Sequence, residues 1–167
     1  MKPSIIVSRP IYPEVIDRLR THFDVTAHQT DPEWTPQTWT QALSQHDGAL
    51  TMGIEPVNAE VLAALGPAGY LINVARGSVV DEQALIEALQ SGAIAGAALD
   101  VFADEPNVPR VLWDMPNLVL TPHMASATHQ TRQAMADLAF ANMEAVLAGR
   151  PALTPVPECL AAQHPQR

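Results

Sequence analysis

The sequence predicts an α/β protein in which helices flank a parallel sheet. Short apolar runs typical of buried strands alternate along the chain with segments whose apolar residues recur at helical spacing. The polar residues that could bind a ligand or transfer a proton follow these strands. In parallel α/β sheets, ligands bind at the carboxyl ends of the strands. Hydrophobic residues make up 47% of the 167 positions and charged residues 16%, which indicates a globular chain with a core.

The amino-terminal part of the chain shows the strand–helix alternation clearly. Strands are expected at 4–8, 24–28 and 48–52. Between the first two, Pro13 suits the first turn of a helix, because its missing N–H would have no partner there. A shorter helix is expected over 38–45. Strands joined in this way are typical of a parallel sheet.

Capping residues define the helices that follow. Asn58 is expected to cap a helix that ends at Gly66, and Asp81 to cap a helix over 82–90 that ends at Gly92. Further strands are expected at 70–74, 93–99 and 117–121, of which the first has the composition of a buried strand. A long helix with a mostly apolar stripe is expected over 128–148, stopped by Gly149 and followed by a proline-rich tail.

Composition also argues against several classes of partner. The formal net charge of −9 is unlike the basic surface of nucleic-acid-binding proteins and disfavours an anionic membrane surface. No apolar run approaches the ~20 residues of a membrane span. Cys159 is the single cysteine, which excludes an intrachain disulfide and a cysteine metal site. We therefore expect a cytoplasmic protein without a metal centre.

Arg76, Asp100 and His123 each lie at or just beyond the end of an expected strand, which favours their meeting in space. Arg76 follows the strand at 70–74, and its planar guanidinium suits a carboxylate or a carbonyl oxygen. His123 follows the strand at 117–121 and can exchange a proton near neutral pH. An acidic side chain could accept the other N–H of the imidazole and fix its tautomer, but the spacing does not choose between Asp104 and Glu105. Taken alone, Arg76 could be an ordinary surface arginine, His123 a structural histidine, and the acid a solvated loop residue.

Three ordered blocks resemble the D-isomer-specific 2-hydroxyacid dehydrogenases, especially their glyoxylate and hydroxypyruvate reductases. The blocks are Leu71–Glu82, Ala98–Pro106 and Pro116–His123, within a resemblance that runs from about Asn58 to Pro157. The resemblance implies a partial Rossmann-like cofactor domain joined to a partial flavodoxin-like substrate domain. It places the beginning of the substrate domain at 1–55, the carboxyl-terminal half of the cofactor domain at 56–127, and a returning helix and tail at 128–167.

The resemblance also implies the roles of individual residues. The catalytic residues would be Arg76, Glu105 and His123. The cofactor, NAD or NADP, would face Ala75, Arg76 and Asp100. The substrate, a small 2-oxo or 2-hydroxy acid, would meet Met52, Gly53, Ile54 and Arg76. Homo-oligomerisation is left open.

The sequence departs from the family at the dinucleotide loop. No G-x-G occurs anywhere, whereas the family carries G-x-G-x-x-G to bind the pyrophosphate. The segment 54–65 fits the family at two places, late in the substrate domain and just before the Arg76 strand. We therefore hypothesise an internal deletion at this junction. Two functions follow as alternatives: NAD(P)H-dependent reduction of small 2-oxo acids, or a non-catalytic remnant that could partner a full-length relative.

Overall fold

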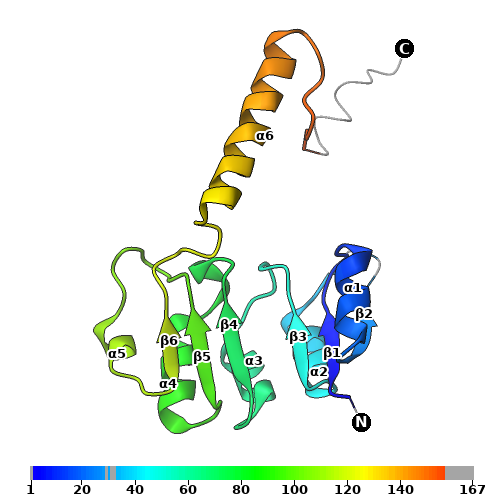
Figure 1. Cartoon of the computed structure of the whole chain (residues 1–167). Coiled ribbons are helices and arrows are strands. Elements are labelled where there is room, and N and C mark those ends of the chain that lie inside the picture. The colour runs from blue at the N-terminus through cyan, green and yellow to red at the C-terminus, as the bar shows by residue number, and fades with distance from the viewer. Residues whose placement is uncertain (1, 29, 31–32, 157–167) are drawn as a thin grey trace. The chain divides into compact units, whose positions relative to one another are not determined.

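The computed structural model describes residues 2–28, 30 and 33–156, and it confirms the α/β class with parallel strands and flanking helices (Figure 1). The chain divides into two compact units, Met1–His123 and Met124–Arg167. The first unit contains both sheets and every candidate site residue. Cys159 and the end of the proline-rich tail lie outside the described residues. The three-part domain division stays a prediction.

The first unit contains two three-stranded parallel sheets. One has the order β2-β1-β3 and the other β4-β5-β6. Their strands are β1 (Ser4–Val7), β2 (Asp24–Ala27), β3 (Gly48–Leu50), β4 (Tyr70–Asn73), β5 (Gly96–Leu99) and β6 (Leu118–Leu120). Strands β3 and β4 are therefore edge strands of different sheets, a feature that the sequence analysis did not anticipate.

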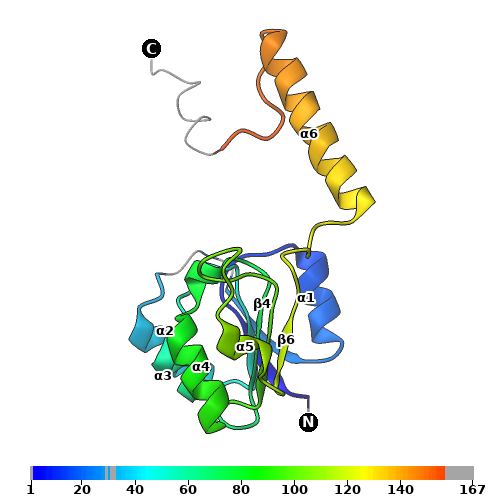
Figure 2. The same cartoon turned by 90° about the vertical axis from the view of Figure 1, so that its left-hand side faces the viewer.

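The helices of this unit cover the strands unevenly (Figure 2). The helices are α1 (Pro13–Arg20), α2 (Pro36–Ser44), α3 (Ala59–Leu65), α4 (Glu82–Ser91) and α5 (Arg110–Trp113), with a short 3₁₀ turn η1 at Gly77–Val79. Helices α2, α3 and α4 lie on one side of the strands and α1 on the other. Neither α5 nor η1 was predicted.

The predicted caps are confirmed. Asn58 Oδ1 accepts the N–H of Val61 at 3.0 Å, and Asp81 Oδ1 accepts the N–H of Ala84 at 3.0 Å. Gly92 ends α4 in the left-handed conformation, with φ of 72°. These local hydrogen bonds fix where α3 and α4 begin, and the left-handed Gly92 fixes where α4 ends.

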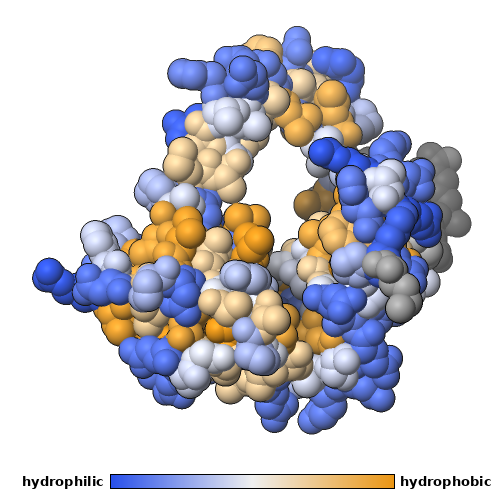
Figure 3. Space-filling view, turned by 60° about the horizontal axis from the view of Figure 1, so that its bottom comes forward, coloured by the Kyte–Doolittle hydropathy of each residue, from blue (hydrophilic) through white to orange (hydrophobic). Residues whose placement is uncertain are grey.

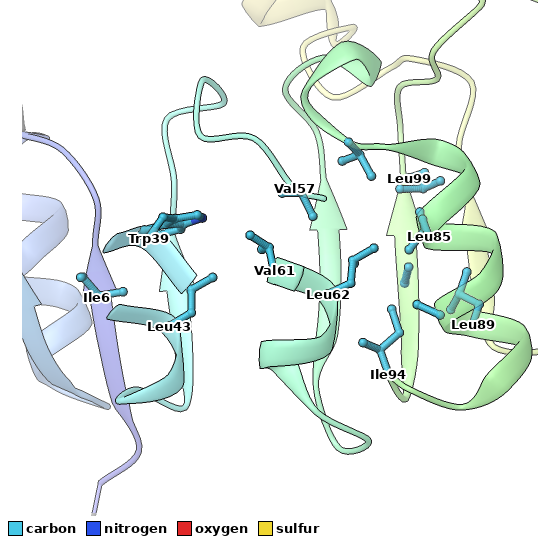
Figure 4. Packing of buried hydrophobic residues seen from close by; sticks show 13 residues of the cluster. Ile6, Trp39, Leu43, Val57, Val61, Leu62, Leu85, Leu89, Ile94 and Leu99 are labelled. Carbon is cyan, nitrogen blue, oxygen red and sulfur yellow. The ribbon is translucent and has the colours of Figure 1, made fainter. Parts of the chain in front are cut away.

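One hydrophobic cluster spans both sheets (Figure 4). Trp39 and Leu43 of α2 lie opposite Val57 and Val61, and Leu62 of α3 continues the cluster toward α4 and β5. Each of these side chains is buried. The packing of α2 against α3 therefore joins the two sheets, although their strands do not pair.

The strand predicted at 70–74 is confirmed as β4, but the prediction that it is buried is wrong. Tyr70 and Ile72 are 69% and 71% exposed, and Leu71 is only partly buried. The sequence pattern is apolar on both faces, but helices cover only one face of β4 (Figure 2). The strand predicted at 93–99 begins only at Gly96, because Ala93 and Ile94 still donate to the Ala88 carbonyl at the end of α4.

The second unit contains the long predicted helix as α6 (His129–Leu147), capped by Thr128 and followed by Gly149 at φ of 71°. Asn142 holds the following segment to the helix, since it donates to Thr154 Oγ1 and accepts the Thr154 N–H. The predicted apolar stripe does not form a core, because Met135, Leu138 and Met143 are exposed. Hydrophobic side chains are visible on the molecular surface in Figure 3.

Candidate active site

The turn that carries Arg76 is held by a buried amide. Asn73, at the end of β4, donates from Nδ2 to the Arg76 carbonyl at 3.0 Å and accepts the Ala75 N–H at 3.1 Å. These bonds bind the turn on both sides of Ala75. The guanidinium is exposed and donates to the Ala75 carbonyl at 2.6 Å, which leaves other N–H groups for an anion.

Gly77 brings this turn against the loop after β5. A Cβ added to Gly77 would lie 1.9 Å from the Phe102 carbonyl oxygen, so only glycine fits this approach. Glu82, at the start of α4, holds the other side of the contact by accepting the Ala103 N–H at 3.3 Å. The Arg76 turn and the loop that carries Glu105 are therefore packed together.

His123 and Glu105 form a close pair. His123 Nδ1 lies 2.7 Å from Glu105 Oε2, while Glu105 Oε1 accepts the Phe102 N–H at 2.9 Å. The structure thus places Glu105 rather than Asp104 beside the imidazole. Because a carboxylate only accepts hydrogen bonds, Nδ1 carries the proton and Nε2 faces away from the pair. His123 has a φ of 49°, which is strained for a residue with a side chain.

The electrostatics of the pair also indicate that Arg76 is near. The hydrogen bond from His123 is the main reason that the pKa of Glu105 lies below its usual 4.5, with help from the Phe102 N–H. The positive charge of Arg76 lowers the same pKa further. The structure therefore brings together the three residues that the sequence analysis proposed as catalytic.

We expect the His123–Glu105 pair to break in acid. The pKa of Glu105 is depressed, so its stabilising contribution is fully present above the ordinary value of 4.5 and is lost as the pH falls through the lower folded value. Carbon-13 NMR of the Glu105 carboxyl would give the midpoint. In His123→Ala the main cause is removed, and the midpoint should rise; an unchanged midpoint would contradict this account.

The proposed substrate loop lies beside Ala75. Gly53 has a φ of 79°, and a Cβ placed on it would meet Ala75 Cβ at 2.5 Å. Behind the loop, Glu55 accepts the Met52 N–H at 3.2 Å and the Arg9 Nε–H at 2.7 Å. The Glu55 carboxylate is fully buried, so this ion pair anchors the loop from inside the fold.

Asp100 lies behind the exposed residues of the site. It is 4% exposed and accepts the Thr121 hydroxyl at 2.5 Å, so it joins the ends of β5 and β6.

No cluster of potential metal ligands occurs among the described residues. In the same part of the chain, no helix is long and apolar enough to cross a membrane.

The helix beginnings near the strand ends do not fit a pyrophosphate. The turn from β1 into α1 carries Pro10 and Pro13, which lack the N–H groups that hold phosphate oxygens, and Glu14 adds a negative charge in the first turn. Helix α4 likewise begins with Asp81 and Glu82. The residues around Arg76 suit a carboxylate, but neither of these two helix beginnings fits a pyrophosphate.

Sequence reasoning missed the residues that position this site. Asn73, Glu82 and the Arg9–Glu55 pair do not contribute the groups that would react. Asn73 could have been suspected, because it is a polar residue at the end of an apolar strand. Arg9 and Glu55 are 46 residues apart, and no local pattern connects them.

Comparisons with known proteins identify the family to which the chain belongs. The profile of the NAD binding domain of D-isomer specific 2-hydroxyacid dehydrogenases matches residues 22–125. Hydroxyphenylpyruvate reductase of Plectranthus scutellarioides is 53% identical over 100 residues, which cover 60% of this chain and 32% of that protein. Glyoxylate/hydroxypyruvate reductase A of Arabidopsis thaliana is 54% identical with the same coverage. The matched segment thus spans about a third of these relatives.

Solved structures extend the similarity beyond this segment. The NADPH-dependent glyoxylate/hydroxypyruvate reductase of Sinorhizobium meliloti, in complex with NADP and malonate, superposes with a TM-score of 0.78 at 40% identity. The superposition covers 94% of this chain and 54% of the reductase. NAD(P) is therefore the cofactor class of the family whose motifs this chain carries. The chain belongs to the D-isomer specific 2-hydroxyacid dehydrogenase family.

Proposed function

We propose that this chain binds small 2-oxo acids at Arg76 and exchanges a proton with them through His123, as part of an NAD(P)H-dependent reduction to 2-hydroxy acids. The observation that carries the proposal is the 2.7 Å contact between His123 and Glu105 beside the Arg76 turn. Relatives named as glyoxylate and hydroxypyruvate reductases support the substrate class.

Each residue has a distinct part in the proposed chemistry. The Arg76 guanidinium binds the carboxylate and the adjacent carbonyl oxygen, which lie in one plane in a 2-oxo acid. The Met52 N–H is already donated to Glu55, so in the loop Met52–Ile54 the backbone N–H groups of Gly53 and Ile54 support the same carboxylate. His123 delivers its Nε2 proton to the carbonyl oxygen, and Glu105 stabilises the charged imidazole and holds its orientation.

A non-catalytic role is the second candidate. The sequence lacks the G-x-G-x-x-G loop, and the beginnings of α1 and α4 do not fit a pyrophosphate; both observations favour this role, because backbone N–H groups and a helix amino terminus normally bind that group. A chain that keeps Arg76 could still bind a carboxylate without reducing it. The two candidates differ in whether the carbonyl is reduced, not in whether it is bound.

Glyoxylate titration and a cofactor oxidation assay separate these candidates. We expect glyoxylate to shift the amide signals of Ala75–Gly77, and NADH or NADPH at millimolar concentration to be oxidised slowly. Turnover should fall roughly 100- to 10,000-fold in His123→Ala, since a positioned acid contributes that much. His22→Ala, an exposed histidine after α1, is the matched control.

Each possible result of these two assays supports or rejects one of the two candidate functions. Glyoxylate binding without any oxidation would support the non-catalytic candidate and reject reduction by this chain. Oxidation that His123→Ala leaves unchanged would reject the proton-transfer role. If glyoxylate shifts no amide near Arg76 even at millimolar concentration, the proposed site itself is wrong.

A further inference from the structure

The turn after β6 holds His123 by its backbone. His123 donates its N–H to the Thr121 carbonyl at 3.1 Å, which closes a tight turn around Pro122. A proline suits this turn, because its ring fixes φ near the value that the centre of an inverse γ-turn needs. The turn leaves His123 at a φ of 49°, a left-handed conformation that costs free energy for a residue with a side chain. Such a conformation persists only where the surrounding structure holds it.

Thr121 fixes the first end of this turn to β5. Its N–H donates to the Leu99 carbonyl at 2.9 Å, which extends the pairing of β6 with β5 (Figure 1). Its hydroxyl donates to Asp100 Oδ1 at 2.5 Å, and a hydrogen bond to a carboxylate is about twice as strong as one between neutral groups. Asp100 is buried, and its own N–H donates to the Asn73 carbonyl at 2.9 Å. The backbone and the side chain of Thr121 are thus both bound to a fixed strand end.

The loop after β5 holds the same histidine a second time, by its side chain. Glu105 Oε2 lies 2.7 Å from His123 Nδ1, so this loop acts on the backbone through Asp100 and on the imidazole through Glu105. The side chain of His123 is 50% exposed, and packing alone therefore does not fix its orientation. The orientation of the imidazole depends on these hydrogen bonds.

We propose that Thr121 is a positioning residue for His123. The Asp100 carboxylate fixes the Thr121 hydroxyl, and the Thr121 carbonyl in turn holds the His123 N–H. The imidazole is thereby kept on Glu105, with its proton on Nδ1 and with Nε2 directed away from the pair. This role rests on the proposed function, in which Nε2 of the charged imidazole delivers its proton to the carbonyl oxygen of the substrate. Thr121 itself contacts no reacting atom.

Thr121 affects proton transfer more than substrate binding. Arg76, which binds the carboxylate, lies on a turn that is held by Asn73 and packed at Gly77, and Thr121 bonds to neither. Loss of the Thr121 hydroxyl should therefore lower kcat about 10- to 100-fold, as expected for one lost hydrogen bond to a charged group. The KM for glyoxylate should stay within about twofold, because the groups that bind the substrate are unchanged.

Nitrogen-15 NMR of the imidazole tests the geometry without requiring turnover. The spectra are recorded on the full chain at a pH at which the imidazole is neutral, where the bond to Glu105 keeps the proton on Nδ1. In Thr121→Val, which keeps the shape of threonine without its donor, part of the population should move to the Nε2 tautomer. Thr121→Ser keeps the hydroxyl and should restore the wild-type spectrum and kcat.

Two further variants complete this series. Thr121 is exposed, so in Thr121→Ala water can reach Asp100, and this variant tests the same loss if Thr121→Val does not fold. Thr21→Val is the matched control, because Thr21 is an exposed threonine after α1 whose hydroxyl donates to the Arg18 carbonyl at 2.6 Å. It should change neither the imidazole spectrum nor kcat.

Two results would overturn the proposal. One is an Nδ1 tautomer that persists unchanged when Thr121 is replaced with valine or alanine. The other is an equal loss of that tautomer in Thr121→Ser and Thr121→Val, because the hydroxyl would then not be its cause. Both results leave the proposed function standing, since neither measures reduction. A chain that oxidises no NADH or NADPH would reject the proposed reduction instead, while the spectra still show whether Thr121 positions the imidazole.

Discussion

Replacing Gly77 with alanine is expected to destabilise the first unit by about 3 kcal/mol or more and to displace the Arg76 turn. The new Cβ would lie 1.9 Å from the Phe102 oxygen, 2.0 Å from its carbon and 2.6 Å from the Ala103 nitrogen. All three atoms are backbone, so no side chain can rotate to relieve the overlap. Urea denaturation would measure the loss of stability, and glyoxylate titration the loss of binding.

Gly48→Ala is the matched control for this substitution. Its Cβ would meet only Ile5 Cγ2 at 3.6 Å, an ordinary van der Waals distance, and alanine is the better strand former. We expect a change within about 0.5 kcal/mol. Equal stability of the Gly77 and Gly48 variants would show that the Arg76 turn and the Phe102 loop are not packed as described.

Replacing Arg9 with methionine is expected to destabilise the fold by about 3–5 kcal/mol, because a buried carboxylate loses its charged partner. Glu55 is fully buried and accepts the Arg9 Nε–H at 2.7 Å. The loop at Met52 should also loosen, since Glu55 accepts its N–H. Urea denaturation at neutral pH measures the first effect, and amide exchange at Met52 and Gly53 the second.

The pH dependence gives the Arg9 variant a distinctive signature. Burial raises the pKa of Glu55, but the Arg9 hydrogen bond and the other bonds to the carboxylate outweigh it and leave that pKa below 4.5. The pair therefore stabilises the chain above pH 4.5 and is lost as the pH falls through the folded value. Without Arg9 burial dominates, so the difference between wild type and variant should shrink in acid.

An exposed ion pair provides the control for Arg9. Arg20 Nη1 lies 3.5 Å from Asp17 Oδ1, and both side chains are more than half exposed. Arg20→Met should cost between 0 and about 1 kcal/mol, as is usual for surface pairs. A loss in the Arg9 variant no larger than this would contradict the anchoring role of Glu55.

Local signals in the sequence were sufficient to predict where helices α3 and α4 begin and end. Asn58, Asp81 and Gly92 act through hydrogen bonds or backbone angles within a few residues, so their effects could be recognised without tertiary information. The gathering of Arg76, Glu105 and His123 was also predictable, because parallel strands end on one edge of a sheet.

Features that depend on distant parts of the chain could not be predicted. Tyr70 and Ile72 belong to an apolar run, but whether such a strand is buried depends on what covers its second face. The buried pairing of Arg9 with Glu55 and the hydrogen bond of Asp100 with Thr121 depend on how the loops meet. Spacing alone did not choose between Asp104 and Glu105; the family resemblance implied Glu105, and the His123 contact agrees with it.

The separation of the two sheets affects how the chain folds. All strands of the first sheet lie before Thr51, so its pairing requires no later residue. We expect this half to form on the ribosome while the remainder is still being synthesised. Trp39 would then stay partly exposed until α3 is synthesised and packs against α2. Its fluorescence should report the moment at which the two halves pack together.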